Sequence, residues 1–208
     1  MSAVRIAVFA KAPVPGRVKT RLAKELGDEG AARLHATLVA RALSTAIESK
    51  AGVVELWCAP DVSHPFFGEC AARFGVALRA QSGADLGERM RHAIDDALSR
   101  GKRALVTGSD CPALDARILR EAAHALEDND AVFVPAEDGG YVLVGARKAI
   151  PGIFEGIAWG GDSVMQATRE RLIRARARWY ELDPLWDVDR PEDYERMRRE
   201  GMAPEAVR

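Results

Sequence analysis

The sequence predicts a three-layer α/β/α sandwich around a mostly parallel sheet. Short apolar stretches rich in β-branched residues alternate along the chain with longer stretches in which apolar residues recur every three or four positions. The first pattern is typical of buried strands and the second of amphipathic helices, and their regular alternation is typical of βαβ units. At 208 residues, of which 48% are hydrophobic, the chain can form one such domain, and we expect that domain to span residues 1–208.

The first half of the chain predicts three strands separated by helices. Residues 4–10 are apolar nearly throughout and indicate a buried strand. After a loop that contains proline and glycine, apolar residues at three- and four-residue spacing over residues 31–45 predict a long amphipathic helix. Further elements are expected as a strand at 53–58, a helix at 66–74, a strand at 76–78 and a helix at 86–97 that Gly101 closes.

The second half continues the same alternation with one interruption. A strand over residues 103–106 leads to Asp110, and a helix is expected over residues 115–126. Two strands, at residues 131–134 and 141–144, flank a turn at Gly139 and Gly140, which indicates a β excursion from the parallel pattern. The remaining expected elements are a helix at 162–176, a strand at 179–182 and a final helix from residue 191.

Composition and charge exclude several functional classes. A formal net charge of −1 argues against binding to nucleic acid or to a membrane surface, because such proteins usually carry a strong basic excess. No apolar stretch approaches the roughly 18–20 residues of a membrane span, and the apolar run at residues 6–10 is too short for a signal peptide. Cys58, Cys70 and Cys111 form neither a C-x-x-C pair nor an even set, so we expect reduced thiols in a cytoplasmic protein.

The most informative segment is Gly108-Ser109-Asp110-Cys111-Pro112, which directly follows an expected strand. A strand that ends in small residues and proline delivers the Asp110 carboxylate to the carboxyl edge of the sheet, where α/β folds bind ligands. A carboxylate in that position can hold a hard divalent cation, which in turn binds a phosphate. The alternative is that Asp110 only caps the following turn.

A basic loop at residues 11–21 follows the first expected strand, so we expect it at the same edge of the sheet. Its cations could bind phosphate oxygens, and Gly16 would let the backbone approach a ligand closely. The loop contains neither a Walker P-loop nor a dinucleotide-binding glycine motif, and the alternative is a solvated basic loop. The candidate phosphate-binding side chains are Lys11, Arg17, Lys19 and Arg21.

Two acidic segments have both structural and functional interpretations. Asp85 and Glu88 have the spacing of a capping box at the start of a helix, and that role suffices to explain them. Asp189 precedes an expected helix and could serve as its N-cap. Because side chains alternate in an extended segment, only one of Asp187 and Asp189 can face a given metal.

The segment Glu137-Asp138-Gly139-Gly140-Tyr141 follows another expected strand. A plain hairpin turn would explain the glycines. With the acids and the aromatic residue beside them, however, the same segment would bring backbone close to a ligand and present polar side chains to it. We therefore regard this segment as a candidate substrate-binding wall. Cys111 is a weaker candidate, as a nucleophile, because no histidine lies near it in the sequence.

The segments that carry these features also occur together, in the same order, in a known family. They are residues 11–13, 15–22, 85–90, 108–112, 138–141 and 187–193, which span nearly the whole chain. In these segments the chain resembles the DUF2064 proteins, also called radical-SAM and selenodomain-associated transferase 1. The resemblance implies a GT-A, or nucleotide-diphospho-sugar transferase, fold. The wider superfamily includes molybdenum-cofactor and phospholactate nucleotidyltransferases.

The resemblance also implies roles for individual residues. Asp110 takes the place of the superfamily's metal-binding acid, although it stands in Ser-Asp-Cys-Pro and not in an Asp-x-Asp motif. Asp189 falls where many relatives supply a second metal-binding acid. The nucleotide and its phosphates would lie near Gly16, Arg17, Lys19, Asp85, Leu86 and Gly87. The acceptor or donor-substrate side would be lined by Gly139, Gly140 and Tyr141.

These observations favour a metal-dependent transferase that moves a glycosyl group from a nucleotide-diphospho-sugar to a small-molecule acceptor. Mg²⁺ or Mn²⁺ on Asp110, with Arg17 and Lys19, would neutralise the developing charge, and Asp138 or Glu137 would accept the acceptor's proton. The expected binding partners are a nucleotide or nucleotide-sugar and that acceptor. The first alternative is a nucleotidyltransferase that joins an NTP to a phosphorylated small molecule, and the second is a non-catalytic nucleotide-binding module.

Overall fold

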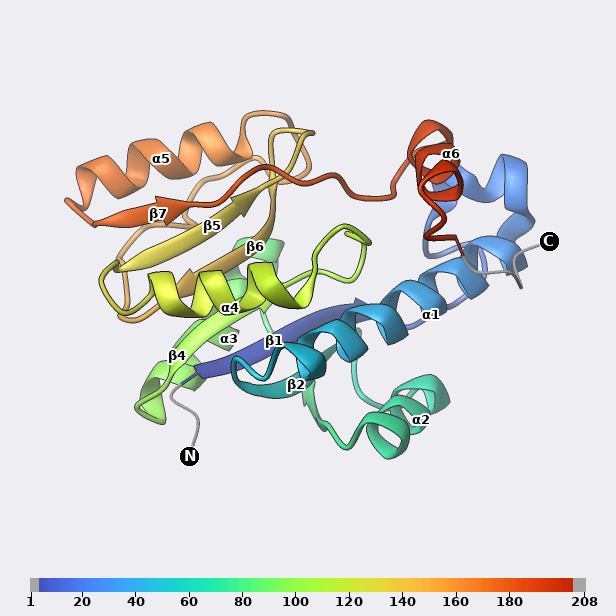
Figure 1. Ribbon diagram of the computed structural model, residues 1–208, viewed down its shortest axis with the longest axis horizontal. Helices are drawn as coiled ribbons and strands as arrows, with labels where there is room; N and C mark the ends of the chain where they lie inside the picture. The colour runs from blue at the N-terminus through green and yellow to red at the C-terminus, as the bar shows by residue number, and fades with distance from the viewer. Residues whose placement is uncertain (1–3, 204–208) are drawn as a thin grey trace.

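A computed structural model describes residues 4–203 of the chain. Within that range, seven strands form one sheet in the order β3-β2-β1-β4-β6-β5-β7 (Figure 1). Strand β6 runs antiparallel to β4 and β5, and the other neighbouring strands are parallel, which confirms the mostly parallel sheet. The strands are β1 Val4–Lys11, β2 Val53–Ala59, β3 Ala77–Ala80, β4 Arg103–Thr107, β5 Ala131–Pro135, β6 Tyr141–Ala146 and β7 Trp179–Glu181.

Helices cover both faces of this sheet, which confirms the three-layer α/β/α architecture (Figure 1). Helices α1, α2 and α4 pack on one face, and α3 and α5 pack on the other. The helices are α1 Ala23–Ser49, α2 Pro65–Phe74, α3 Leu86–Ser99, α4 Ala116–Ala125, α5 Val164–Arg174 and α6 Pro191–Arg199, with a short 3₁₀ helix η1 at Thr20–Leu22.

The unbroken apolar run of β1 follows from this layering. Successive side chains of a strand point to opposite faces, so Ile6 and Val8 pack with α1 and α4 while Ala7 and Phe9 pack with α3. The two faces build two separate clusters of buried side chains. A strand covered on both faces has no solvent-facing positions, and for that reason it shows no polar alternation.

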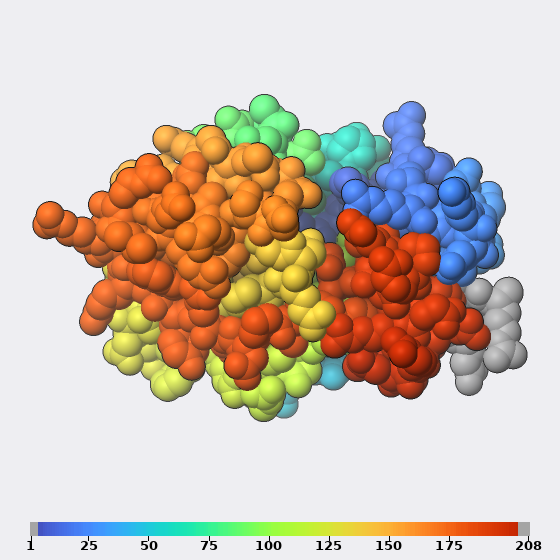
Figure 2. All heavy atoms as spheres, turned by 90° about the horizontal axis from the view of Figure 1, so that it is seen from above, coloured from blue at the N-terminus to red at the C-terminus, as the bar shows by residue number. Residues whose placement is uncertain are grey.

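The last helix, α6, packs against α1 in a third apolar cluster that includes Leu34, Leu38, Tyr194 and Met197. An extended segment runs from β7 to α6 and joins the two ends of the molecule (Figure 1). Figure 2 shows that the surface is hollowed between the region of α5 and the region formed by α6 and the start of α1. The hollow lies at the carboxyl ends of the parallel strands, where ligands of α/β proteins bind.

The main difference from the expected elements is the start of α1. The helix begins at Ala23, well before the apolar stripe that predicts it, and Gly27 interrupts it with φ 66° and ψ 166°. Only glycine adopts that conformation readily, so the chain changes direction there before the regular helix continues. No helix among residues 4–203 combines the length and the apolarity that crossing a membrane would need.

Candidate active site

The candidate site is built where the sheet changes its direction of winding. Strand β1 lies between β2, which follows it in the chain, and β4, which the chain reaches by crossing back. Ligands of doubly wound sheets bind at such a point, beyond the carboxyl ends of the strands. The Thr107 hydroxyl donates a hydrogen bond to the Val142 carbonyl at 2.9 Å and so fixes the end of β4 against β6. Asp110 follows directly, in irregular backbone, as its sequence predicted.

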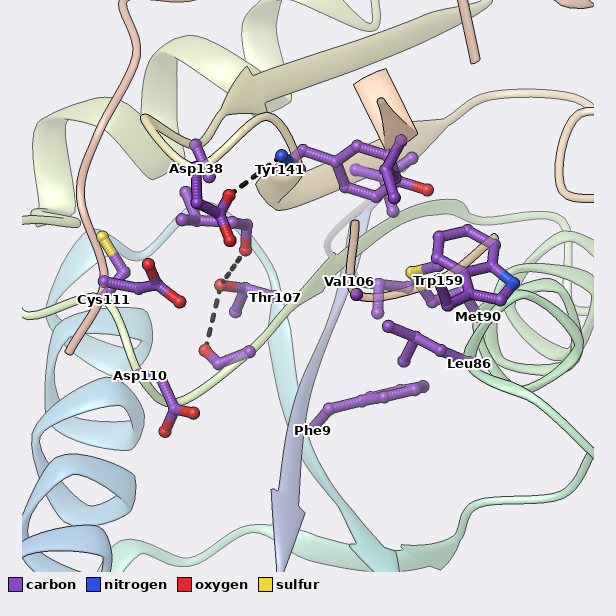
Figure 3. Close-up of a pocket in the computed structure, with 18 of the residues that line it drawn as sticks. Phe9, Leu86, Met90, Val106, Thr107, Asp110, Cys111, Asp138, Tyr141 and Trp159 are labelled. Carbon is purple, nitrogen blue, oxygen red and sulfur yellow. Dashed lines mark hydrogen bonds between the residues drawn. The ribbon is translucent and has the colours of Figure 1, made fainter. Parts of the chain in front are cut away.

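A cavity of about 250 Å³ opens at this edge. Figure 3 shows the carboxylates of Asp110 and Asp138 on one side of it and the apolar side chains of Leu86, Met90 and Trp159 on the other. Asp187 also lines the cavity. Three acids from separate segments therefore meet at one opening, although they lie far apart in the sequence.

Asp110 is held by two cationic or potentially cationic side chains. The Lys19 Nζ lies 2.7 Å from its Oδ2, and the His35 Nδ1 lies 3.6 Å from its Oδ1. Burial opposes ionisation of this carboxyl, but Lys19 and His35 outweigh burial and hold its pKa well below the usual range. The side chain is nevertheless 42% exposed, so an ionised carboxylate faces the cavity.

The Lys19 side chain is buried, although it belongs to a basic loop whose cations were expected at the surface. Its side chain is only 3% exposed, and Nζ donates both to Asp110 and to the Val188 carbonyl. The residue adopts a left-handed backbone conformation with φ 49°, which is uncommon for a residue with a side chain. Lys19 therefore acts as the internal counter-ion of Asp110 and not as a solvated loop cation.

The sequence interpretation missed His35. Its Nε2 lies 3.0 Å from the Lys11 carbonyl, and because a carbonyl only accepts, this nitrogen carries a proton. The ring thereby links the end of β1 to the carboxylate that follows β4. The available signal was a single histidine between Leu34 and Leu38 on the apolar stripe of a long helix, and its buried polar ring needs a partner.

The structure distinguishes the two acids that precede α6. Asp187 lines the cavity, whereas the Asp189 carboxylate pairs with Arg21 at the surface, and the buried Val188 separates them. Burial, together with the negative charge of Asp138, raises the pKa of Asp187 to about 6, although Lys19 acts in the opposite direction. The structure thus favours Asp187 over Asp189 as the second acid at the cavity, and a metal-binding role of Asp189 stays a prediction.

The turn between β5 and β6 presents Asp138 to the cavity. Gly139 has φ 92°, and a Cβ there would lie 1.9 Å from the Asp162 carbonyl oxygen, so glycine is required for the close approach of the two segments. The Gly140 amide donates to Asp138 Oδ1 at 2.9 Å and orients that carboxylate. Glu137 instead pairs with Arg196 of α6 at 2.8 Å and does not line the cavity. Of the two candidate bases, the geometry favours Asp138.

The remaining loop cations fall into two groups. Arg21 is engaged by Asp189. Lys11 and Arg17 are exposed and form no ion pair with any residue in the described part of the chain. Gly16 precedes Arg17 with φ 72° and lies beside the Asp28 carboxylate of α1. Two cations of the loop after β1, the strand whose Phe9 lines the cavity, thus carry no ion pair within the described part of the chain.

The helix start at Asp85 has the structural role that its spacing indicated. Asp85 is the N-cap of α3 and accepts a hydrogen bond from the Glu88 amide at 2.8 Å, while Glu88 accepts one from the Ala84 amide. Leu86 then projects over the cavity. Gly87 is needed for packing, because a Cβ there would lie 2.5 Å from the Trp159 ring. Whether these residues also contact a nucleotide stays a prediction.

The donor set at the cavity fits a hard cation. Among residues 4–203 no three histidine, cysteine, aspartate or glutamate side chains form a ready-made metal cage. Magnesium rarely needs one, because it is usually held by one or two carboxylates and completes its shell with water and substrate phosphates. Asp110 and Asp187 both line the cavity and would supply that number of carboxylates. Burial raises the pKa of the adjacent Cys111 thiol to about 12, which keeps it protonated and disfavours a nucleophilic role.

This fold and site define a class of protein. A seven-stranded sheet of this order, with an acid after β4 and a basic loop after β1, is that of a transferase with the nucleotide-diphospho-sugar transferase fold. The family model described as "Uncharacterized protein conserved in bacteria (DUF2064)" matches residues 42–161, which is more than half of the chain. The protein belongs to the DUF2064 family.

Solved structures agree with that assignment. A candidate nucleotide-diphospho-sugar transferase from Desulfovibrio desulfuricans G20 is 36% identical, with a TM-score of 0.83 over 91% of this chain and 84% of that chain. A nucleotidyl transferase from Methanothermobacter is 14% identical, with a TM-score of 0.64 over 96% and 98% of the two chains. A 4-diphosphocytidyl-2C-methyl-D-erythritol synthase from Anaerococcus prevotii DSM 20548 is 12% identical, with a TM-score of 0.65 over 96% of each chain. The last two likenesses concern the fold alone. No curated protein matches the chain in sequence.

Proposed function

We propose that the protein is a metal-dependent glycosyltransferase that uses a nucleotide-diphospho-sugar and a small-molecule acceptor in the cytoplasm. The observation that carries this proposal is the meeting of Asp110, Asp138 and Asp187 at one cavity, in a fold whose loop after β1 holds the unpaired cations Lys11 and Arg17. Acids alone would repel a diphosphate, and cations alone would not hold a metal or accept a proton. Their combination suits a reaction in which a diphosphate leaves and a hydroxyl attacks.

Binding of the donor would use both kinds of charge. Asp110 and Asp187 would hold Mg²⁺ or Mn²⁺, which when bound neutralises negative charge on the leaving diphosphate. Lys11 and Arg17 would donate charge-assisted hydrogen bonds to phosphate oxygens. Lys19 keeps Asp110 ionised and fixes its orientation from within the protein.

Asp138 would accept the proton of the acceptor hydroxyl as its oxygen attacks the sugar. The carboxylate lines the cavity and is oriented by the Gly140 amide. Gly140 and Tyr141 also line the cavity, in agreement with a substrate-binding role for this segment. Tyr141 itself would not act as an acid or base near neutral pH, because burial raises its pKa far above the usual range.

Nucleotidyl transfer from an NTP to a phosphorylated small molecule is the second candidate. The observation that favours it is the pair of unpaired cations, Lys11 and Arg17, which would suit a triphosphate as well as a diphosphate. An acceptor phosphate is already ionised and needs no base, so the position of Asp138 in the cavity favours glycosyl transfer.

The proposal is tested by calorimetric titration of nucleoside diphosphates and nucleotide-sugars with Mg²⁺, with Mn²⁺ and with EDTA. Asp110→Asn should abolish the metal-dependent part of nucleotide binding, whereas Asp128→Asn, an exposed acid outside the cavity, should leave it unchanged. Arg17→Ala should weaken a diphosphate about tenfold or more while hardly affecting the nucleoside, because a charge-assisted contact is worth roughly 1.5–3 kcal/mol. Unchanged affinity of Asp110→Asn in Mg²⁺ would contradict the proposal.

The two reactions are separated by their products. The protein is incubated with each NTP, Mg²⁺ and a panel of phosphorylated acids, and pyrophosphate is measured. We expect none. Acceptor-dependent release of pyrophosphate that disappears in Asp110→Asn would establish nucleotidyl transfer instead.

A further inference from the structure

One end of the cavity supplies no acid or cation to the chemistry proposed above. Phe9 of β1, Leu86 and Met90 of α3, Val106 of β4, Val144 of β6 and Trp159 of the segment before α5 form this end. Figure 3 shows the side chains of Phe9, Leu86, Met90 and Trp159 grouped opposite the carboxylates of Asp110 and Asp138. Because the apolar end is formed by three adjacent strands and a covering helix, it belongs to the fold and not to one loop alone.

The apolar end offers few hydrogen-bonding groups to a ligand. The Thr107 hydroxyl already donates to the Val142 carbonyl. The Tyr141 hydroxyl and the Trp159 Nε1 have no hydrogen-bond partner among the described residues, but both atoms are buried and present almost no surface to the cavity. The carboxylates of Asp110 and Asp138 lie at the opposite end, and their charges act on the carboxyl of Asp187.

This distribution bears on the chemistry of the acceptor. A sugar acceptor carries a hydroxyl on almost every carbon, and each hydroxyl buried here would lose its water without gaining a partner. A hydrocarbon group loses nothing polar and gains the free energy of leaving water. The cavity, apolar at one end and acidic at the other, therefore favours a ligand that is itself apolar at one end and polar at the other.

We propose that the acceptor is an alcohol with a hydrocarbon body, whose hydroxyl lies at Asp138 and whose hydrocarbon group fills the apolar end of the cavity. This inference rests on the proposed glycosyl transfer. In that reaction the alcohol oxygen forms a bond to the sugar's anomeric carbon, and the bond from that carbon to the diphosphate breaks. The proton of the hydroxyl passes to Asp138, and the bonding electron pair leaves with the nucleoside diphosphate.

The test uses the full chain labelled with ¹³C at its methionine methyl groups and titrated with linear alcohols from ethanol to hexanol. Met90 lines the cavity and reports binding there, while Met197, in the cluster of α6, serves as the internal control. Met90→Leu identifies the Met90 signal. The Kd read from Met90 should fall about fourfold for each added methylene until the cavity is filled, and the Met197 signal should not move. Glucose and glycerol should leave the Met90 signal unchanged.

A matched pair of variants places the alcohol. Val106→Thr adds a hydroxyl to the apolar end of the cavity without a change of shape and should weaken the binding of hexanol several-fold. Val8→Thr makes the same change at an equally buried position on the opposite face of the sheet and should leave hexanol affinity unchanged. Should Val106→Thr fail to fold, the chain-length series on the unaltered protein still decides the matter.

The outcomes separate the two proposals. A Met90 Kd that is independent of chain length, or glucose binding as tight as hexanol binding, would overturn the hydrocarbon acceptor even if nucleotides bind as proposed. Failure of every nucleotide to bind in Mg²⁺ or Mn²⁺, with the chain-length dependence intact, would overturn the glycosyltransferase and leave the apolar site standing.

Discussion

Replacement of Asp187 by asparagine should make the free protein more stable and at the same time remove a part of its function. The pKa of Asp187 rises from 3.8 to about 6, because the carboxyl is half-buried and faces Asp138 and Asp110. A carboxyl whose pKa is raised in the folded state binds its proton more tightly there than in the unfolded chain. Its contribution to the stability of the folded protein therefore falls as the pH rises from about 4 to about 6. At pH 8 the ionised carboxylate destabilises the folded protein by the full amount.

The magnitude follows from the size of the shift. Each pKa unit corresponds to about 1.4 kcal/mol, so a shift of about two units sets a ceiling of about 3 kcal/mol. Solvent screens part of the interaction at a half-buried group, and we expect Asp187→Asn to add about 1–2 kcal/mol at pH 8. For a chain of this size, each kcal/mol raises Tm by about 2–4 °C.

The assay is urea unfolding of the two proteins in EDTA at pH 8 and near pH 4. The stability difference should be present at pH 8 and nearly absent near pH 4, where the carboxyl of the unaltered protein is protonated. Other titrating groups are common to both proteins and cancel in the difference. With Mg²⁺ and a nucleoside diphosphate, only the unaltered protein should gain further stability. An asparagine variant that is less stable at pH 8, or equally stable at both pH values, would refute the crowding of carboxylates at this cavity.

Two further predictions concern the stability of the fold. Glu55 is almost fully buried, and its Oε1 forms ion pairs with Arg5, Arg79 and Arg100. Together these arginines outweigh the effect of burial and lower the pKa of Glu55. Glu55→Gln should cost about 2–4 kcal/mol in urea unfolding at pH 7, and the difference should shrink as the pH falls below about 4.5, because the Glu55 carboxyl then takes up a proton in the unfolded chain before it does so in the folded protein. Gly139→Ala should cost about 3 kcal/mol or more, since its Cβ would overlap the Asp162 carbonyl. Its control is Gly160→Ala, at a similar φ of 84° with open space around it, which should cost only about 1–2 kcal/mol. Equal losses in the two glycine variants would show that strain alone, and not the close approach, requires Gly139.

The elements and their order were predictable because their causes are local. Buried strands such as β1 and β4 appear as short apolar runs, and α3 appears as an apolar stripe that begins at the capping residue Asp85. Asp110 was identifiable for the same reason, because a small, polar, proline-containing segment after a buried strand can lie only at the carboxyl edge of the sheet. The kink at Gly27 was not predictable, because its cause is the path by which the loop after β1 enters α1.

The sequence by itself therefore determined the α/β architecture, the edge at which the site lies and the presence of acids and cations there. Only the tertiary structure decided which charges meet. It paired Lys19 with Asp110, placed His35 behind that carboxylate, turned Glu137 toward Arg196 and directed Asp187, not Asp189, into the cavity. The physical reason is that periodicity and capping act over a few neighbouring residues. Charge pairing depends instead on distances between segments that only the assembled sheet brings together.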